Sequence, residues 1–208
     1  ITCRDWSSDV CSSDLTSYPD SRTIGQLNAL YAQQVKYKAS LPSKESGLAA
    51  FRQDIQARVR RATAFRSANT PLDIQPRGSI RQGDMLVEML TYQSEPGITI
   101  PALLFRPQGG AAGAAAILYA ADENKAADAA GEIAALVKAG HTVLAPDVRG
   151  KGELERDLET NGIFRDWFSS DWQMAMMALQ VKKPLVGMRA LDLVRALDVL
   201  TGLEHQGR

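Results

Sequence analysis

The residues of this chain best suited to chemistry lie in the string Asp147-Val148-Arg149-Gly150-Lys151-Gly152, a D-x-R-G-x-G turn after a short apolar run. Its two glycines fit a turn that needs positive φ or a close backbone approach. Arg149 could contact a substrate, but we expect it to pair with Asp147 or another carboxylate. The pattern therefore predicts that Asp147, Arg149 and Gly150 shape the edge of a site structurally.

Neither of the two histidines has the surroundings expected of a catalytic base. His141 lies just before an apolar run, where a histidine packs or hydrogen-bonds locally, and His205 lies in a polar tail. The sequence contains no G-x-S-x-G motif, which would present a serine nucleophile on a sharp strand-to-helix turn. No cluster of His, Asp and Glu predicts a metal site, and no cofactor is expected.

The D-x-R-G-x-G turn closes a predicted strand–helix–strand unit over residues 114–153. The uncharged run Ala115–Ala120 predicts a strand buried on both faces. A helix follows, with apolar residues at helical spacing at Ala126, Ala129, Ala130, Ile133, Leu136 and Val137. Gly140 is placed to end that helix, and Thr142–Ala145 predicts a second buried strand. The connection should be a right-handed crossover between parallel strands.

The remaining sequence predicts elements on both sides of this unit. Apolar spacing predicts helices over 23–37, 44–65 and 188–200. Residues 84–92 and 97–105 alternate as two strands joined by a Pro-Gly turn. The fold class is therefore α/β, with N-terminal helices, an antiparallel strand pair and then a parallel βαβ unit.

Two segments resemble one enzyme family. APDVRGKGE (145–153) and KPLVGMRALDLVRALDVL (183–200) are similar to bacterial acetyl xylan esterase-like α/β-hydrolases, relatives of cephalosporin deacetylases and prolyl-oligopeptidase-type domains. The resemblance covers about residues 84 to 202. It implies a truncated α/β-hydrolase, with 81–208 as the first half of the domain and 16–80 as a helical extension.

The resemblance also implies where a site would lie. The family's serine, acid and histidine follow in that order after the last helix, so the nucleophile, acid and base are expected beyond Arg208 and the chain alone should be inactive. One oxyanion N–H comes from the loop after the first strand of the βαβ unit, where Ala121 and Asp122 are the candidates. The family's usual His-Gly pair is absent there. Asp122 or Asn124 could instead cap the following helix.

The implied activity is serine-dependent hydrolysis of a carboxylic ester, with a small-molecule or acetylated carbohydrate ester as substrate of the full-length protein. A prolyl-oligopeptidase-type peptidase and a non-catalytic α/β binding module are the alternatives. A dinucleotide-binding domain is excluded because the first βα turn reads AADENKA in place of G-x-G-x-x-G.

Composition excludes two classes of partner. Lys plus Arg and Asp plus Glu each total 24, so the formal net charge of zero does not favour a nucleic-acid partner. No apolar stretch approaches the roughly 18 residues of a membrane span, so no membrane partner is expected. Localisation stays open, and a secreted or periplasmic location is compatible with the sequence.

The first fifteen residues differ in composition from the rest of the chain. DWSSDVCSSDL (5–15) resembles the translation of a sequencing-library adapter, and we expect residues 1–15 to be an artefact without ordered structure. A natural Ser/Asp-rich tail is the alternative. Both cysteines, Cys3 and Cys11, lie in this stretch, so neither a disulfide nor a redox compartment is inferred from them.

The resemblance also predicts how the isolated chain behaves in solution. In an α/β-hydrolase the strand at Ala115–Ala120 lies between the strand at Thr142–Ala145 and a strand that this sequence does not contain. An unpaired apolar strand edge recruits other chains. The isolated chain is therefore expected to be aggregation-prone or to unfold with poor cooperativity.

Overall fold

A computed structural model of the chain describes residues 21–35, 41–109, 115–155 and 170–205. The chain divides into two units, Ile1–Phe51 and Arg52–Arg208. The segment expected to be an artefact, 1–15, lies outside the described residues together with both cysteines. No helix in the described ranges is long and apolar enough to cross a membrane.

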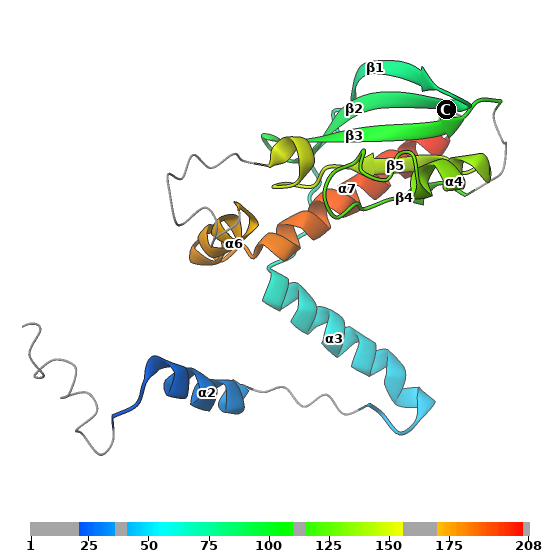
Figure 1. Cartoon of the computed structure of the whole chain (residues 1–208). Coiled ribbons are helices and arrows are strands. Elements are labelled where there is room, and N and C mark those ends of the chain that lie inside the picture. Colours follow the sequence, from blue (N-terminus) through cyan, green and yellow to red (C-terminus); the bar gives the residue numbers. More distant parts are fainter. Residues whose placement is uncertain (1–20, 36–40, 110–114, 156–169, 206–208) are drawn as a thin grey trace, which may run out of the picture. The chain divides into compact units, whose positions relative to one another are not determined.

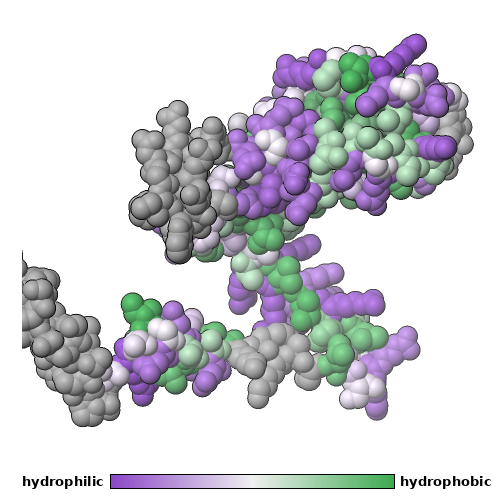
Figure 2. All heavy atoms as spheres, viewed as in Figure 1, coloured by the Kyte–Doolittle hydropathy of each residue, from purple (hydrophilic) through white to green (hydrophobic). Residues whose placement is uncertain are grey.

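The first unit contains helix α2 (Ile24–Val35), a 3-10 turn η2 (Glu45–Gly47) and the start of α3 (Leu48–Thr63). Thr23 and Gln26 form a capping box, in which each side chain accepts from the other's backbone N–H, at 3.3 and 2.9 Å. No residue of α2 is buried, and apolar and polar side chains share its surface (Figure 2). The helices predicted over 23–37 and 44–65 are thus confirmed, with shorter bounds.

The second unit is built on a five-stranded sheet of order β1-β2-β3-β5-β4 (Figure 1). Its strands are β1 (Gln75–Gln82), β2 (Met85–Glu95), β3 (Ile98–Pro107), β4 (Ile117–Leu118) and β5 (Val143–Pro146). Strands β1, β2, β3 and β5 pair antiparallel in that order, whereas β4 pairs parallel with β5. The predicted antiparallel pair and the parallel pairing are confirmed, but β4 has only two half-buried residues where a strand buried on both faces was expected over Ala115–Ala120.

Strand β1 is an addition that the sequence pattern did not predict. All eight of its residues are exposed, so it has no apolar alternation to recognise. Its ladder with β2 is interrupted by an irregularity between Pro76 and Gly78, and it carries Arg77 and Arg81. Proline, a bulge and charged side chains are the features that keep an edge strand from pairing with other chains. This edge of the sheet is protected.

The helix between β4 and β5 is shorter than its apolar spacing predicts. Residues 125–131 form turns, and α4 spans only Glu132–Lys138. The Asn124 side chain accepts from the Ala126 N–H at 2.9 Å, a local bond that competes with helix formation. At the other end Gly140 has φ 95, and His141 N donates to Leu136 O at 3.1 Å. That is a Schellman ending, as the glycine predicts.

Helices cover both faces of the sheet. On one face α4 packs in a cluster with β2, β3 and β5 that contains Val87, Phe105, Ile133, Val137, Val143 and Ala145. On the other face α7 (Leu185–His205) packs in a cluster that contains Leu90, Tyr92, Ile100, Ala102, Leu104, Leu144, Ala196, Val199 and Leu200. Helix α6 (Ser170–Gln180) and the turn η3 (Gly152–Leu154) complete the unit.

Two apolar features of this unit have no covering element among the described residues. Strand β4 is the last strand of the sheet, and its outer edge pairs with no strand there. On the outer side of α7, Val186, Val194 and Leu197 are 62%, 41% and 48% exposed. These features support the expected tendency to aggregate.

We therefore predict that the double substitution Val194→Lys and Leu197→Lys raises the soluble concentration of the isolated chain by roughly two- to five-fold, because it breaks the exposed stripe on α7. The measurement is the protein left in solution after ultracentrifugation at rising concentration. The control is Ile80→Lys, since Ile80 is 54% exposed on the protected strand β1. An equal gain from Ile80→Lys would show that the α7 stripe plays no special part.

Candidate functional site

Two loops meet where the parallel strands end: the loop after β4 (119–126) and the turn after β5 (147–153). Asp147 is the first residue of this turn, and its side chain is only 1% exposed. Its carboxylate accepts from the Lys125 backbone N–H at 2.6 Å, the Lys125 ammonium at 2.6 Å and the Glu153 N–H at 3.0 Å. The partner of Asp147 is thus Lys125, a residue that the sequence pattern did not single out.

The two glycines of the turn adopt the conformation that the motif requires. Gly150 has φ 77 and Gly152 has φ 53. A Cβ on Gly152 would lie 2.3 to 2.4 Å from the Asp147 carboxylate atoms, and the Gly152 N–H donates to Glu123 O at 3.1 Å. Gly152 is therefore needed both for its backbone angle and for the close approach of Asp147.

This close approach predicts that Gly152→Ala destabilises the chain more than its backbone angle alone would. The matched control is Gly97→Ala, because Gly97 has φ 77 but an added Cβ would meet nothing within 4 Å. We expect about 1 kcal/mol for Gly97→Ala and roughly 3 kcal/mol for Gly152→Ala, measured by urea unfolding. Equal losses would mean that the contact with Asp147 adds nothing.

Arg149 extends to the α7 side of the same edge. Its guanidinium bonds Asp192 of α7 at 2.6 and 2.9 Å, Glu95 at 2.8 Å and the Ser94 hydroxyl at 3.1 Å. Its backbone N–H donates to Asp192 at 3.1 Å. Burial acts to lower the pKa of Arg149, but the bonds to Asp192 and Glu95 raise the pKa overall. The expected ion pair exists, with Asp192 and Glu95 in place of Asp147.

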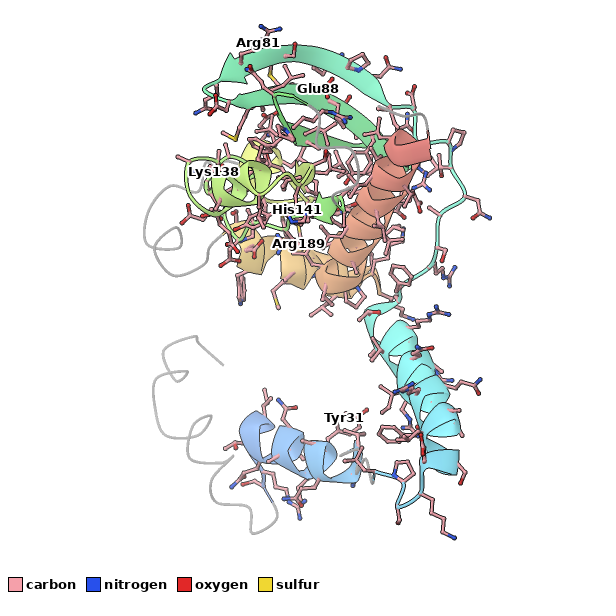
Figure 3. All side chains as sticks on the ribbon, turned by 90° about the vertical axis from the view of Figure 1, so that its right-hand side faces the viewer. Tyr31, Arg81, Glu88, Lys138, His141 and Arg189 are labelled. Atoms are coloured by element: carbon pink, nitrogen blue, oxygen red, sulfur yellow. The ribbon has the colours of Figure 1, made fainter. Side chains whose placement is uncertain are left out.

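A second arginine holds the turn from α7. Arg189 Nε donates to the Arg149 carbonyl at 3.0 Å, and its guanidinium pairs with Asp171 of α6 (Figure 3). Hydrogen bonding to Arg189 lowers the pKa of the Asp171 carboxyl. The turn after β5 is thus bound to the loop after β4 through Asp147 and to α7 and α6 through Arg149 and Arg189.

The candidate oxyanion residues lie in the loop after β4. Ala121 is half-buried and Asp122 is exposed. Within the described part of the chain, neither backbone N–H has a hydrogen-bond acceptor. Of the two residues that could cap the following helix, Asn124 accepts a hydrogen bond from the Ala126 N–H, whereas the Asp122 side chain has no described partner. The N–H groups of Ala121 and Asp122 are therefore available to a ligand.

A cavity of about 820 Å³ opens beside this edge, on the α4 side of the sheet. Lys125, Asp147 and Glu153 line one wall, and Met89 and Leu103 lie on the strand side. Ala121, Asp122, Arg149 and Gly150 do not line it. The structure therefore brings Asp147 to the cavity but places the other candidates around it.

Of the two histidines, only the side chain of His141 lies within the described part of the chain. His141 Nδ1 lies 2.8 Å from the carbonyl oxygen of Ala115, which is 26 residues earlier in the sequence, so its hydrogen bond joins the segments before the two parallel strands. The side chain of His205 lies outside the described residues. Over the ranges that the structure describes, no three His, Cys, Asp or Glu side chains are grouped to hold a metal ion.

Comparison with known proteins identifies similar structures but no matching sequence family. No known family and no curated protein matches the sequence. A solved structure from Bacteroides fragilis NCTC 9343, provisionally assigned as an acetyl xylan esterase, matches 88% of this chain and 51% of its own, with TM-score 0.65 and 13% identity. An acetyl xylan esterase from Paenibacillus sp. R4 matches 87% of this chain and 52% of its own (TM-score 0.47, 19% identity). A glucuronoyl esterase from Solibacter usitatus matches 81% and 55% (TM-score 0.48, 14% identity).

The chain thus spans about half the length of the structures that it matches. Identities this low are evidence of fold alone, and of these three structures the Bacteroides one is similar enough to support an argument. Its match extends over most of this chain. The chain has the fold of a partial α/β-hydrolase domain, as its sequence predicts.

Proposed function

We propose that this chain is the N-terminal part of a serine-dependent ester hydrolase, acting in its full-length form on acetylated carbohydrate or another small ester. The observation that carries the proposal is the loop after β4. Its N–H groups at Ala121 and Asp122 have no acceptor in the described structure, and the loop lies at the strand ends where α/β folds bind ligands. Free backbone donors held in this way are what an oxyanion requires.

The chain would supply a scaffold and one oxyanion donor. When a nucleophile attacks the ester carbonyl, the carbonyl oxygen gains negative charge and the N–H of Ala121 or Asp122 would donate to it. The exposed Asp122 carboxylate would need to point into solvent, because a negative charge beside the oxyanion would oppose the reaction. The second donor and the nucleophile would come from polypeptide that follows α7.

The buried carboxylates of this edge are unsuited to act as the acid of a triad. Asp147 accepts three hydrogen bonds from Lys125 and Glu153. Asp192 accepts from the backbone and the guanidinium of Arg149. A triad acid orients a histidine, whereas the hydrogen bonds of these two carboxylates hold the turn after β5 to its neighbours. This supports a structural role for both carboxylates.

A peptidase of the same fold and a non-catalytic binding module are the competing proposals. The coding DNA past the codon for Arg208 separates them. We expect a Val/Ile-rich strand followed by G-x-S-x-G, and later an acid and a histidine. A reading frame that continues without that motif would favour the binding module. Release of acetate from acetylated xylan, compared with cleavage of a prolyl-peptide anilide, then separates esterase from peptidase.

A further inference from the structure

The ion pair between Asp147 and Lys125 is unusually enclosed. The two side chains are 1% and 8% exposed, and their charged atoms lie 2.6 Å apart. Taking both charges out of water costs free energy, which the fold recovers only if the geometry and the added hydrogen bonds are good. Asp147 meets that condition, since it also accepts from the Lys125 and Glu153 N–H groups.

The partners of this carboxylate come from two different loops. Lys125 belongs to the loop after β4, whereas Glu153 is the last residue of the turn after β5. The Lys125 ammonium also contacts Glu153 Oε1 at 2.5 Å, and Gly152 N donates to Glu123 O at 3.1 Å. One buried carboxylate thus joins the loop to the turn.

The loop is held at both of its ends and at the Glu123 carbonyl, but the N–H groups between its ends have no acceptor. At its start, Tyr119 N donates to Leu144 O of β5 at 2.8 Å. At its end, Lys125 N donates to Asp147. From Ala120 to Asn124, no backbone N–H has an acceptor within the described ranges. A five-residue stretch of free donors is therefore fixed between two anchors, and the second anchor is Asp147.

We propose that Asp147, acting through Lys125, is a positioning residue that holds the loop after β4 with its free N–H groups at the strand ends. The proposal rests on the proposed function, because positioning matters to catalysis only if these N–H groups receive an oxyanion. Donors that are fixed before the reaction pay no reorganisation cost when charge develops. Asp147 would act without touching the substrate.

The test is hydrogen–deuterium exchange by mass spectrometry on the 208-residue chain, at micromolar concentration. In Asp147→Asn, fragments covering 119–126 and 147–155 should exchange about ten-fold faster at their protected amides, while a fragment covering 85–105 changes less than about three-fold. This local pattern separates positioning from a general loss of stability, which would accelerate exchange in all fragments alike. Uniform acceleration, or no change in the two loops, would overturn the proposal.

A second variant keeps the test decisive if Asp147→Asn does not fold. Lys125→Met removes the ammonium but keeps the backbone N–H bonded to Asp147, so the same fragments should accelerate by about three-fold or more. The matched control is Lys151→Met, since Lys151 lies on the same cavity wall but contacts Asp171 at 3.6 Å. Equal effects of the two lysine substitutions would contradict the assignment. Exchange does not depend on hydrolysis, so this result and the proposed function can fail separately.

Discussion

Replacing Arg149 by methionine is expected to cost roughly 3–5 kcal/mol of the free energy of unfolding, because it leaves a buried charge without its partner. Asp192 is fully buried, with side-chain exposure of 0%, and the Arg149 guanidinium is its main source of compensation. After the substitution the Asp192 carboxylate would keep only the hydrogen bond from the backbone N–H of residue 149, at 3.1 Å. The same change would remove the hydrogen bonds from Arg149 to Glu95 and Ser94 at the end of β2.

Urea unfolding followed by far-ultraviolet circular dichroism measures this loss, at concentrations where light scattering detects no association. The control is Arg106→Met, whose partner Glu88 lies at 2.7 Å in a pair with side chains 20% and 40% exposed. A partly exposed pair of this kind contributes about 1 kcal/mol or less. The double variant Arg149→Met with Asp192→Leu should recover much of the loss, since it removes both charges. If Arg149→Met and Arg106→Met cost the same, the turn after β5 is not anchored as described.

The second large effect concerns hydrolysis. We expect the 208-residue chain to release p-nitrophenol from p-nitrophenyl acetate no faster than its two imidazoles allow, because it contains no G-x-S-x-G motif and its buried edge carboxylates are engaged in ion pairs. The matched control is the variant in which His141 and His205 are both replaced by glutamine. Saturable turnover that survives in this control would show that the chain carries a nucleophile of its own.

Much of the fold could be predicted from the sequence because its elements bury regular apolar patterns. The β2–β3 pair carries an alternation that is visible in the sequence, and α7 carries a helical one. Strand β1 could not be found in this way, since its residues are exposed and it forms only by pairing with β2. Helix α4 was predicted too long because the spacing of its alanines does not reveal the local bond between Asn124 and the Ala126 N–H, which competes with helix formation.

The candidate site was harder to predict because its contacts join residues far apart in the chain. Lys125 precedes its partner Asp147 by 22 residues, and Arg149 is separated from Asp192 by 43. A lysine in a polar turn and an aspartate on an amphipathic helix both resemble surface residues until the fold buries them. One signal was present: an aspartate directly after a buried strand needs a cation nearby, and the closest one in the preceding loop is Lys125.

The proposal that this chain is one part of a serine ester hydrolase is tested most directly by comparing two proteins. These are the 208-residue chain and the product of the whole reading frame that encodes it, each treated with a fluorophosphonate probe and with acetylated xylan. We predict that the whole product is labelled on one serine after α7 and releases acetate, while the 208-residue chain does neither. A whole product that takes up no probe and releases no acetate would contradict the proposal.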